Sequence, residues 1–140
     1  MNIMFFLSPK SETVYETLNV KLQHVLERMN HHRLTAIPVI DQEGRYIGTM
    51  TEGDVLRVIQ ENPTTSYEKV AKLKVSQIPR RSDHKSVRVD ETLNSIVDLT
   101  LRQNFVPVVD DEGTYIGIVK RADIIEYLYE SKINKPVRAL

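Results

Sequence analysis

The chain contains no cysteine, and this absence excludes disulfide bonds, thiolate catalysis and metal sites built from cysteine. A reducing environment is compatible with such a composition, so we expect a cytoplasmic location. An excess of charge of either sign is also lacking, because 19 lysines and arginines balance 19 aspartates and glutamates. The balance removes the whole-chain electrostatic argument for a nucleic acid or an anionic membrane as partner. Any polyanionic ligand must therefore be met by a local basic patch.

A long hydrophobic run is missing too. Residues 1–7 are apolar, but they carry no basic flank and end at Ser8-Pro9-Lys10, far short of the ~20 residues that span a bilayer. The phenylalanines in this segment would be a liability if they were left exposed. We therefore interpret the segment as an arm that packs on the core or on a second subunit, and we expect no membrane insertion.

Signatures of catalysis and of metal binding are likewise absent. The sequence has no Gly-x-Ser-x-Gly elbow, phosphate-binding P-loop or Gly-x-Gly-x-x-Gly fingerprint. The four histidines, His24, His31, His32 and His84, do not form a useful metal array, since the adjacent pair faces in different directions on a helix. The clustered carboxylates lie in repeated turns, where aspartate and glycine are favoured for turn geometry. We expect no enzyme, no metal and no catalytic cofactor.

The chain does contain an internal repeat. Residues 38–61 and 107–130 align at an offset of 69, and ten of the 24 aligned positions are identical. Upstream of each segment, apolar residues recur at helical spacing. They are Leu22, Val25, Leu26 and Met29 in the first copy and Leu93, Ile96, Val97 and Leu101 in the second. A module of about 60 residues is marginal alone, so we expect the two copies to share a core.

Each copy is expected to run helix, strand, turn, strand, helix. In the first copy these elements are residues 19–31, 37–40, 41–44, 46–50 and 52–60, and the second copy repeats them within 92–130. Residues 67–76 predict a linking helix. The fold class is thus α+β (α/β), with two small, mostly three-stranded sheets that each carry two helices. We expect a first module with the arm at 1–66, and the linking helix with the second module at 67–140.

The repeated pattern resembles the CBS domain. It consists of Pro-Val-hydrophobic-Asp, a turn glycine, Tyr-Ile-Gly, two hydrophobic residues and a Thr-x-x-Asp that opens a helix, as in residues 38–54. The duplicated arrangement makes the resemblance specific, and it covers nearly the whole chain. It implies two modules packed about a pseudo-twofold axis, as in small stand-alone bacterial proteins of this kind, and a homodimer. It also implies clefts that bind AMP, ADP, ATP or a related adenine compound.

The resemblance further implies a nucleotide site in the first copy, where Asp54 would hold the ribose hydroxyls and Thr51 would lie near the phosphate. Backbone and small side chains would meet the adenine at Thr35, Ala36, Ile37 and Pro38. The matching residues of the second copy are Asn104, Phe105, Val106, Pro107, Lys120, Arg121 and Asp123. There a lysine replaces the hydroxyl residue, and we expect it to supply charge to a phosphate.

Physical chemistry supports these roles independently. A carboxylate accepts strong hydrogen bonds from the two hydroxyls of a ribose, and a helix N-terminus offers free N–H groups and a positive dipole to a phosphate. Cations are needed as well, and we expect Arg80 and Arg81 to clamp the phosphate, with Lys10 at the corresponding place before the first copy. Two alternatives stay open, because Thr51-x-x-Asp54 is also typical of helix capping and the basic stretch 80–85 of a solvated loop.

The sequence thus predicts a regulatory module that senses an adenine nucleotide in the clefts between its two copies. A cyclic di-AMP receptor that acts on a partner protein is an alternative, because a double arginine suits two phosphates. A ligand-free structural module, which dimerises through Phe5, Phe6 and the last helix, is the alternative from a different class. Nucleic acid is not expected as a partner.

Overall fold

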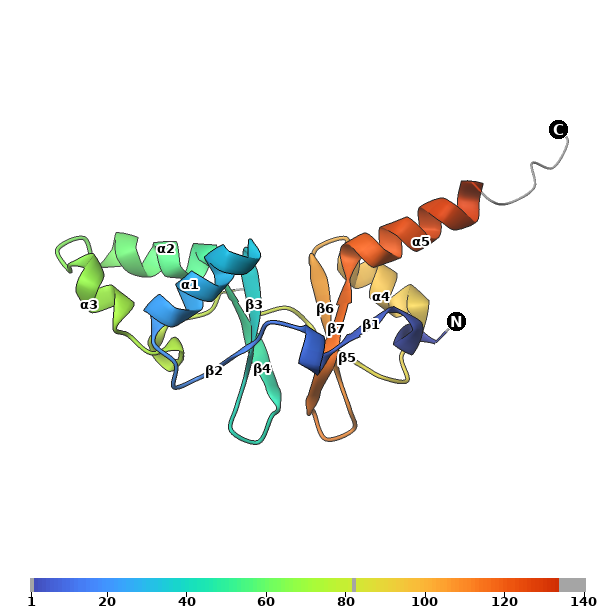
Figure 1. Cartoon of the computed structure of the whole chain (residues 1–140), viewed down its shortest axis with the longest axis horizontal. Coiled ribbons are helices and arrows are strands. Elements are labelled where there is room, and N and C mark those ends of the chain that lie inside the picture. Colours follow the sequence, from blue (N-terminus) through green and yellow to red (C-terminus); the bar gives the residue numbers. More distant parts are fainter. Residues whose placement is uncertain (1, 82, 134–140) are drawn as a thin grey trace, which may run out of the picture.

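The computed structural model describes residues 2–81 and 83–133 (Figure 1). The helices in this part of the chain are α1 (Leu22–His32), α2 (Glu52–Glu61), α3 (Tyr67–Ala71), α4 (Leu93–Thr100) and α5 (Arg121–Ile133). The strands are β1 (Leu7–Pro9), β2 (Glu16–Thr17), β3 (Ala36–Ile40), β4 (Tyr46–Thr51), β5 (Val87–Arg88), β6 (Phe105–Val109) and β7 (Tyr115–Lys120). Short 3-10 turns cover Ile3–Phe6, Lys10–Glu12 and Val75–Gln77.

The strands form two sheets, in the orders β2-β3-β4 and β1-β7-β6-β5. Each sheet is built on an antiparallel hairpin, β3 with β4 and β6 with β7, and β2 or β5 adds to it in parallel. The pairing register repeats, since Ile37 lies opposite Met50 and Val106 opposite Val119. This arrangement confirms the expected α+β class and the duplicated sheet-and-helix module.

The two hairpin turns are copies of one another and bind each other. In each turn an aspartate accepts two backbone N–H bonds, as Asp41 and Asp110 do at 2.9 Å, and a glycine follows with φ of +82°. Between the turns, the amide of Tyr46 donates to the carbonyl of Gly113 at 3.1 Å, and the amide of Tyr115 donates to Gly44 at 2.9 Å. The reciprocal pair of bonds relates the copies by a pseudo-twofold axis between the two sheets.

Each hydrophobic core takes a segment from the other half of the chain. The core under α1 and α2 also buries residues of α3 and the turn after it, namely Val70, Val75 and Ile78. The core of the second copy buries Ile3 and Phe6 of the N-terminal arm, because β1 pairs antiparallel with β7. The arm therefore packs on the core, which was one of the two alternatives that the sequence suggested. Phe5 of the arm nevertheless stays 72% exposed. Each core thus combines residues from both sides of the expected boundary at residues 66 and 67.

Several boundaries differ from the expected ones. The first helix begins at Leu22 instead of residue 19, and the linking helix ends at Ala71, after which a 3-10 turn follows at Val75–Gln77. The sequence predicted mostly three-stranded sheets but located only two strands in each copy. The positions of β1, β2 and β5 were not predicted, because two or three residues are too few to show the period-two alternation of a strand. No helix in the described residues has the length and apolar character needed to cross a membrane.

One buried ion pair distinguishes the first copy from the second. The carboxylate of Glu16 in β2 is buried and pairs with Arg28 of α1. The structurally matching residues in the second copy are Val87 and Leu99, which are apolar. Replacing Arg28 with leucine leaves the Glu16 charge buried without its partner, so we expect the free energy of unfolding to fall by about 2–4 kcal/mol. Urea unfolding followed by circular dichroism measures this change.

The second copy supplies the control for that substitution. A double variant, Glu16→Val with Arg28→Leu, installs the apolar pair of the second module, and we expect it to recover most of the lost stability because no charge remains buried. A double variant as unstable as the single one would show that the ion pair itself is required for the packing of β2.

Candidate functional site

The junction between β4 and α2 carries the Thr-x-x-Asp pattern and forms a capping box. The amide of Asp54 donates to Thr51 Oγ1 at 3.3 Å, and the amide of Thr51 donates to Asp54 Oδ2 at 2.9 Å. These two bonds satisfy N–H groups that the first turn of a helix leaves free. The capping interpretation is therefore confirmed, and it uses only one of the two carboxylate oxygens.

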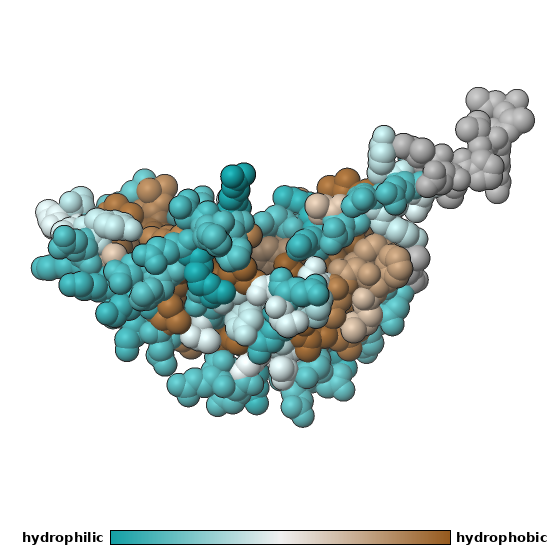
Figure 2. All heavy atoms as spheres, in the orientation of Figure 1, coloured by the Kyte–Doolittle hydropathy of each residue, from teal (hydrophilic) through white to brown (hydrophobic). Residues whose placement is uncertain are grey.

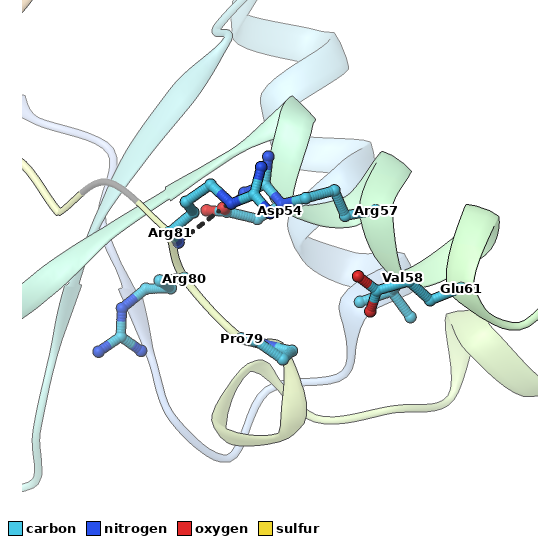
Figure 3. Close-up of a pocket in the computed structure, with 7 residues that line it drawn as sticks. All are labelled: Asp54, Arg57, Val58, Glu61, Pro79, Arg80 and Arg81. Carbon is cyan, nitrogen blue, oxygen red and sulfur yellow. Dashed lines mark hydrogen bonds and ion pairs between the residues drawn. The ribbon is translucent and has the colours of Figure 1, made fainter.

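The second oxygen of Asp54 faces the inter-copy segment, residues 79–81 and 83–85, which links the two copies. Oδ1 accepts a hydrogen bond from the backbone amide of Arg81 at 3.1 Å and forms an ion pair with Arg57, one turn further along α2. Figure 3 shows the guanidinium of Arg57 and the backbone of Arg81 converging on this carboxylate. The side chain of Asp54 is only 1% exposed, so the link between α2 and the inter-copy segment is shielded from solvent.

A pocket of about 250 Å³ opens beside this carboxylate. Its lining comes from α2 and from the inter-copy segment, and consists of Asp54, Arg57, Val58, Glu61, Pro79, Arg80 and Arg81 (Figure 3). Arg80 contributes to the lining, but its guanidinium points away from the hollow (Figure 3) and pairs with Asp83. The other charged lining residues are Arg57 and Arg81 with the carboxylates Asp54 and Glu61. An anionic group that enters this pocket meets arginine side chains at the N-terminal turn of α2, where the helix dipole also favours negative charge.

The inter-copy segment is held against β4 by side-chain bonds. Asp83 Oδ1 accepts the amide of Thr49 and the Nε–H of Arg80, both at 2.9 Å. A Cβ at Gly48 would lie 2.3 Å from the same oxygen, so only glycine permits this approach. The hydroxyl of Tyr46 donates to the carbonyl of His84 at 2.7 Å. Burial raises the pKa of Tyr46 well above its usual value, so the hydroxyl keeps its donor proton.

The second copy has a matching pocket of about 380 Å³ with a different lining. It is formed by Phe5, Phe6, Leu7, Ser8, Asp123, Glu126, Tyr127 and Glu130. By the offset of the repeat, Asp123 matches Asp54, but Glu126 stands where the first copy has Arg57. No lysine or arginine of residues 2–81 and 83–133 lines this pocket. Two structurally equivalent hollows therefore differ in charge, because arginines and carboxylates line the first whereas the charged residues that line the second are all acidic.

A third hollow, of about 430 Å³, lies on the other side of Thr51 between the two copies. It is lined by Thr51, Asp83, His84, Lys85, Asp98, Leu99, Leu101, Arg102 and Gln103. The buried amide of Gln103 holds the backbone of Lys85 through two hydrogen bonds, of 2.8 and 3.0 Å. Because Thr51 borders this hollow and caps the helix of the arginine-lined pocket, both hollows meet at the β4–α2 junction.

The structure brings together some of the residues singled out in the sequence and separates others. Asp54, Arg80 and Arg81 line one pocket, next to the cap residue Thr51. Lys10 lies elsewhere, with its ammonium 5.1 Å from the ring centre of Tyr15. Lys120, at the end of β7, is exposed, and Arg121 donates to the carbonyl of Thr100 at 3.3 Å. Neither lines the Asp54 pocket or the Asp123 pocket.

The adenine-side candidates occupy equivalent places in the two copies. Ala36, Ile37 and Pro38 are buried in β3, directly after Thr35, whose carbonyl accepts the amide of Glu52 at 3.0 Å. Phe105, Val106 and Pro107 are buried in β6, directly after Asn104, whose carbonyl accepts the amide of Arg121 at 3.0 Å. The Asn104 side chain bonds His84 Nε2 at 3.0 Å, and the His84 ring packs on Phe105. Thr35 lines a separate hollow of about 460 Å³ formed by residues of the first copy.

Sequence reasoning missed four residues that line the Asp54 pocket, Arg57, Val58, Glu61 and Pro79, and Arg57 is the one that contacts Asp54. The available signal was its position three residues after Asp54, a spacing at which helical side chains become neighbours. Reasoning from charge density alone instead favoured the basic stretch 80–85. Within the described residues, no group of three or more histidine, aspartate and glutamate side chains is placed to hold a metal ion.

Known proteins share this sequence pattern and this architecture. The family model for the CBS domain matches residues 8–61 and 75–130. An uncharacterized protein of Methanocaldococcus jannaschii is 26% identical over 147 aligned positions, covering 85% of this chain and 86% of its own length.

Two solved structures with a bound nucleotide are similar in fold. The Listeria monocytogenes CbpB protein in complex with c-di-AMP superimposes with a TM-score of 0.81 at 21% identity, over 94% of this chain and 97% of its own. CBSX2 in complex with AMP gives a TM-score of 0.75 at 22% identity, over 94% of this chain and 98% of its own. At identities this low, the similarity shows that the chains share a fold.

Proposed function

The chain belongs to the CBS domain family, and from that premise we propose that it is a regulatory module that binds a phosphorylated adenine nucleotide and catalyses no reaction. AMP, ADP and ATP are the ligands proposed first. The nucleotide occupies the Asp54 pocket and the adjoining space between the copies. Binding fixes the inter-copy segment against α2, which alters the surface presented to a regulated partner protein.

One observation carries this proposal: a buried carboxylate, two consecutive arginines and a helix N-terminus meet in a single pocket. The carboxylate suits ribose hydroxyls, and the guanidinium of Arg81 suits phosphate oxygens, which guanidinium binds in a two-pronged fashion. Arg80 joins it when its guanidinium turns from Asp83 to the phosphate. In this arrangement Lys10, Lys120 and Arg121 make no phosphate contact in the Asp54 pocket. Support also comes from CBSX2 and CbpB, which share the fold and are bound to AMP and to c-di-AMP respectively.

Cyclic di-AMP is the second candidate ligand, and the neighbouring hollow favours it. The 430 Å³ hollow beyond Thr51 adds space that a mononucleotide does not need, and two phosphates would use both Arg80 and Arg81. The two candidates differ in what they require, because a mononucleotide depends on one ribose at Asp54 whereas a cyclic dinucleotide spreads its contacts over both hollows.

A homodimer is proposed alongside the ligand. Matching positions of α2 and α5 expose large apolar side chains, Leu56 and Ile59 on the first helix and Ile125 and Leu128 on the second. In Figure 2, hydrophobic residues gather on the helical side and near the N-terminal arm, while the edge formed by the hairpin turns is hydrophilic. A symmetric pair of apolar helix faces suits association with a second copy. Sedimentation at micromolar concentration tests this, and a monomer there would contradict it.

A ligand panel tests the proposed function directly. Thermal unfolding with AMP, ADP, ATP, c-di-AMP and S-adenosylmethionine should show a shift for at least one nucleotide, because ligand at one hundred times its Kd stabilises by about 2.7 kcal/mol. For a chain of this size that corresponds to roughly 5–12 °C. If calorimetry detects no binding of any panel member at millimolar concentration, the ligand-free structural module replaces this proposal.

Removing the paired arginines is expected to weaken nucleotide binding selectively. In the double variant Arg80→Gln with Arg81→Gln, we expect at least a tenfold rise in the Kd for AMP, because two charge-assisted contacts to phosphate are lost. Titration calorimetry at two salt concentrations measures this loss and its electrostatic origin. The matched control is Arg88→Gln, an exposed arginine on β5 that pairs with Asp90 and Asp111. Equal losses in both variants would contradict a phosphate clamp at positions 80 and 81.

A further inference from the structure

The carboxylate of Asp54 is already engaged in this structure. Within the described residues, three donors reach it: the backbone amides of Thr51 and Arg81 and the guanidinium of Arg57. An ionised carboxylate offers about four acceptor positions, and a ribose diol requires two of them. A ribose can therefore bind Asp54 only if one of the present donors leaves.

Arg57 is the donor able to leave. The other two are backbone amides, fixed by the helix cap and by the inter-copy segment. The Arg57 side chain is 28% exposed, whereas that of Asp54 is 1% exposed, so rotation about its side-chain bonds moves the guanidinium into the pocket without disturbing the backbone. Once moved, it faces the hollow that Arg81 also lines.

The cost of that movement depends on the ligand. If the ligand carries a phosphate in the pocket, Arg57 exchanges one strong anionic partner for another. If the ligand is an unphosphorylated nucleoside, the guanidinium loses Asp54 and gains only Glu61, one helical turn further on and exposed to solvent. An exposed pair of this kind contributes little.

We propose that Arg57 makes the site selective for phosphorylated nucleosides: it blocks the ribose acceptor Asp54 until a phosphate draws it away. The inference rests on the proposed nucleotide function and assigns a specificity-determining residue to it. This movement of an arginine from the aspartate to a phosphate belongs to the first copy, because in the second copy Glu126 occupies the position that matches Arg57, beside Asp123.

Arg57→Gln tests the proposal through two ligands measured side by side, adenosine and AMP. Removing the guanidinium opens Asp54, so adenosine should bind about three to ten times more tightly, while AMP should bind about ten times more weakly because a charged phosphate contact is lost. The preference for AMP over adenosine then falls by roughly thirty- to a hundredfold. Arg88→Gln serves as the charge-matched control and should leave both affinities unchanged.

The outcomes separate this inference from the function on which it rests. A wild-type chain that binds no nucleotide contradicts the proposed function. A wild-type chain that binds AMP, with a variant whose adenosine affinity is unchanged or reduced, contradicts the role of Arg57 alone. If Arg57→Gln does not fold, Arg57→Lys replaces it: an ammonium holds the carboxylate less well than a guanidinium does, and the adenosine affinity should again rise, by a smaller factor. No rise in that variant overturns the proposal.

Discussion

Replacing Asp54 with asparagine is expected to abolish detectable AMP binding and to lower the free energy of unfolding by about 1–3 kcal/mol. The carboxylate accepts from two backbone amides and pairs with Arg57. An amide supplies only one acceptor oxygen, so its NH2 group must face another donor, and the neutral side chain no longer attracts ribose hydroxyls as strongly. Titration calorimetry gives the binding, and urea unfolding gives the stability.

Two further variants serve as comparisons for Asp54→Asn. Asp111→Asn changes an aspartate whose side chain is 80% exposed, and it should alter neither AMP binding nor stability. Asp123→Asn changes the matching residue of the second copy and reports whether the Asp123 pocket takes part in binding. A folded Asp54→Asn chain that binds AMP as well as wild type does would remove Asp54 from the ligand site and leave it a helix-capping residue.

Gly117→Ala is expected to lower the free energy of unfolding by about 2–4 kcal/mol. Gly117 has a φ of +153°, and a Cβ there would lie 2.1 Å from the backbone carbonyl oxygen of Ser8. Since Gly117 is the register partner of Pro9, relieving the clash must part β1 from β7. The arm residues Ile3 and Phe6 then lose the burial that β1 gives them. Urea unfolding measures the loss, and amide hydrogen exchange shows whether β1 opens.

Gly53→Ala is the matched control for that substitution. Its Cβ would meet nothing closer than Arg57 Nη1 at 3.5 Å, and its place in the first turn of α2 suits alanine better than glycine. We expect no loss, and a gain of about 0.5–1 kcal/mol is consistent with helix propensity. A Gly117→Ala chain as stable as wild type would mean that the arm does not depend on pairing with β7.

The repeat made much of the fold predictable from sequence. Both hairpins and α2 follow from segments 38–61 and 107–130, where alternating apolar residues, turn aspartates and glycines, and a helix start agree with one another. The capping box at Thr51 and Asp54 followed from their spacing alone. Local signals were sufficient here because each of these elements is determined mainly by its own residues.

The features that sequence reasoning missed depend on contacts between distant segments. Strand β1 exists because β7 offers an open edge more than 100 residues later, and no local pattern encodes that. The same limit applies to the charges of the site: Arg80 and Arg81 reach the Asp54 pocket, while Lys120 and Arg121, which lie closer to Asp123 in sequence, do not line its pocket. Which basic side chains reach a pocket depends on the path that the chain takes after a strand ends, and the sequence alone does not determine that path.

The reciprocal exchange of segments between the two cores bears on how such a chain assembles. The arm completes the second sheet, and α3 with the turn after it completes the first core. A single copy with the same contacts would have to borrow the missing segment from another molecule, and its folding would then depend on concentration. Joining two copies in one chain makes that borrowing intramolecular, with an effective concentration set by the connecting segment instead of by the amount of protein. Duplication in this fold therefore replaces a bimolecular step with a unimolecular one.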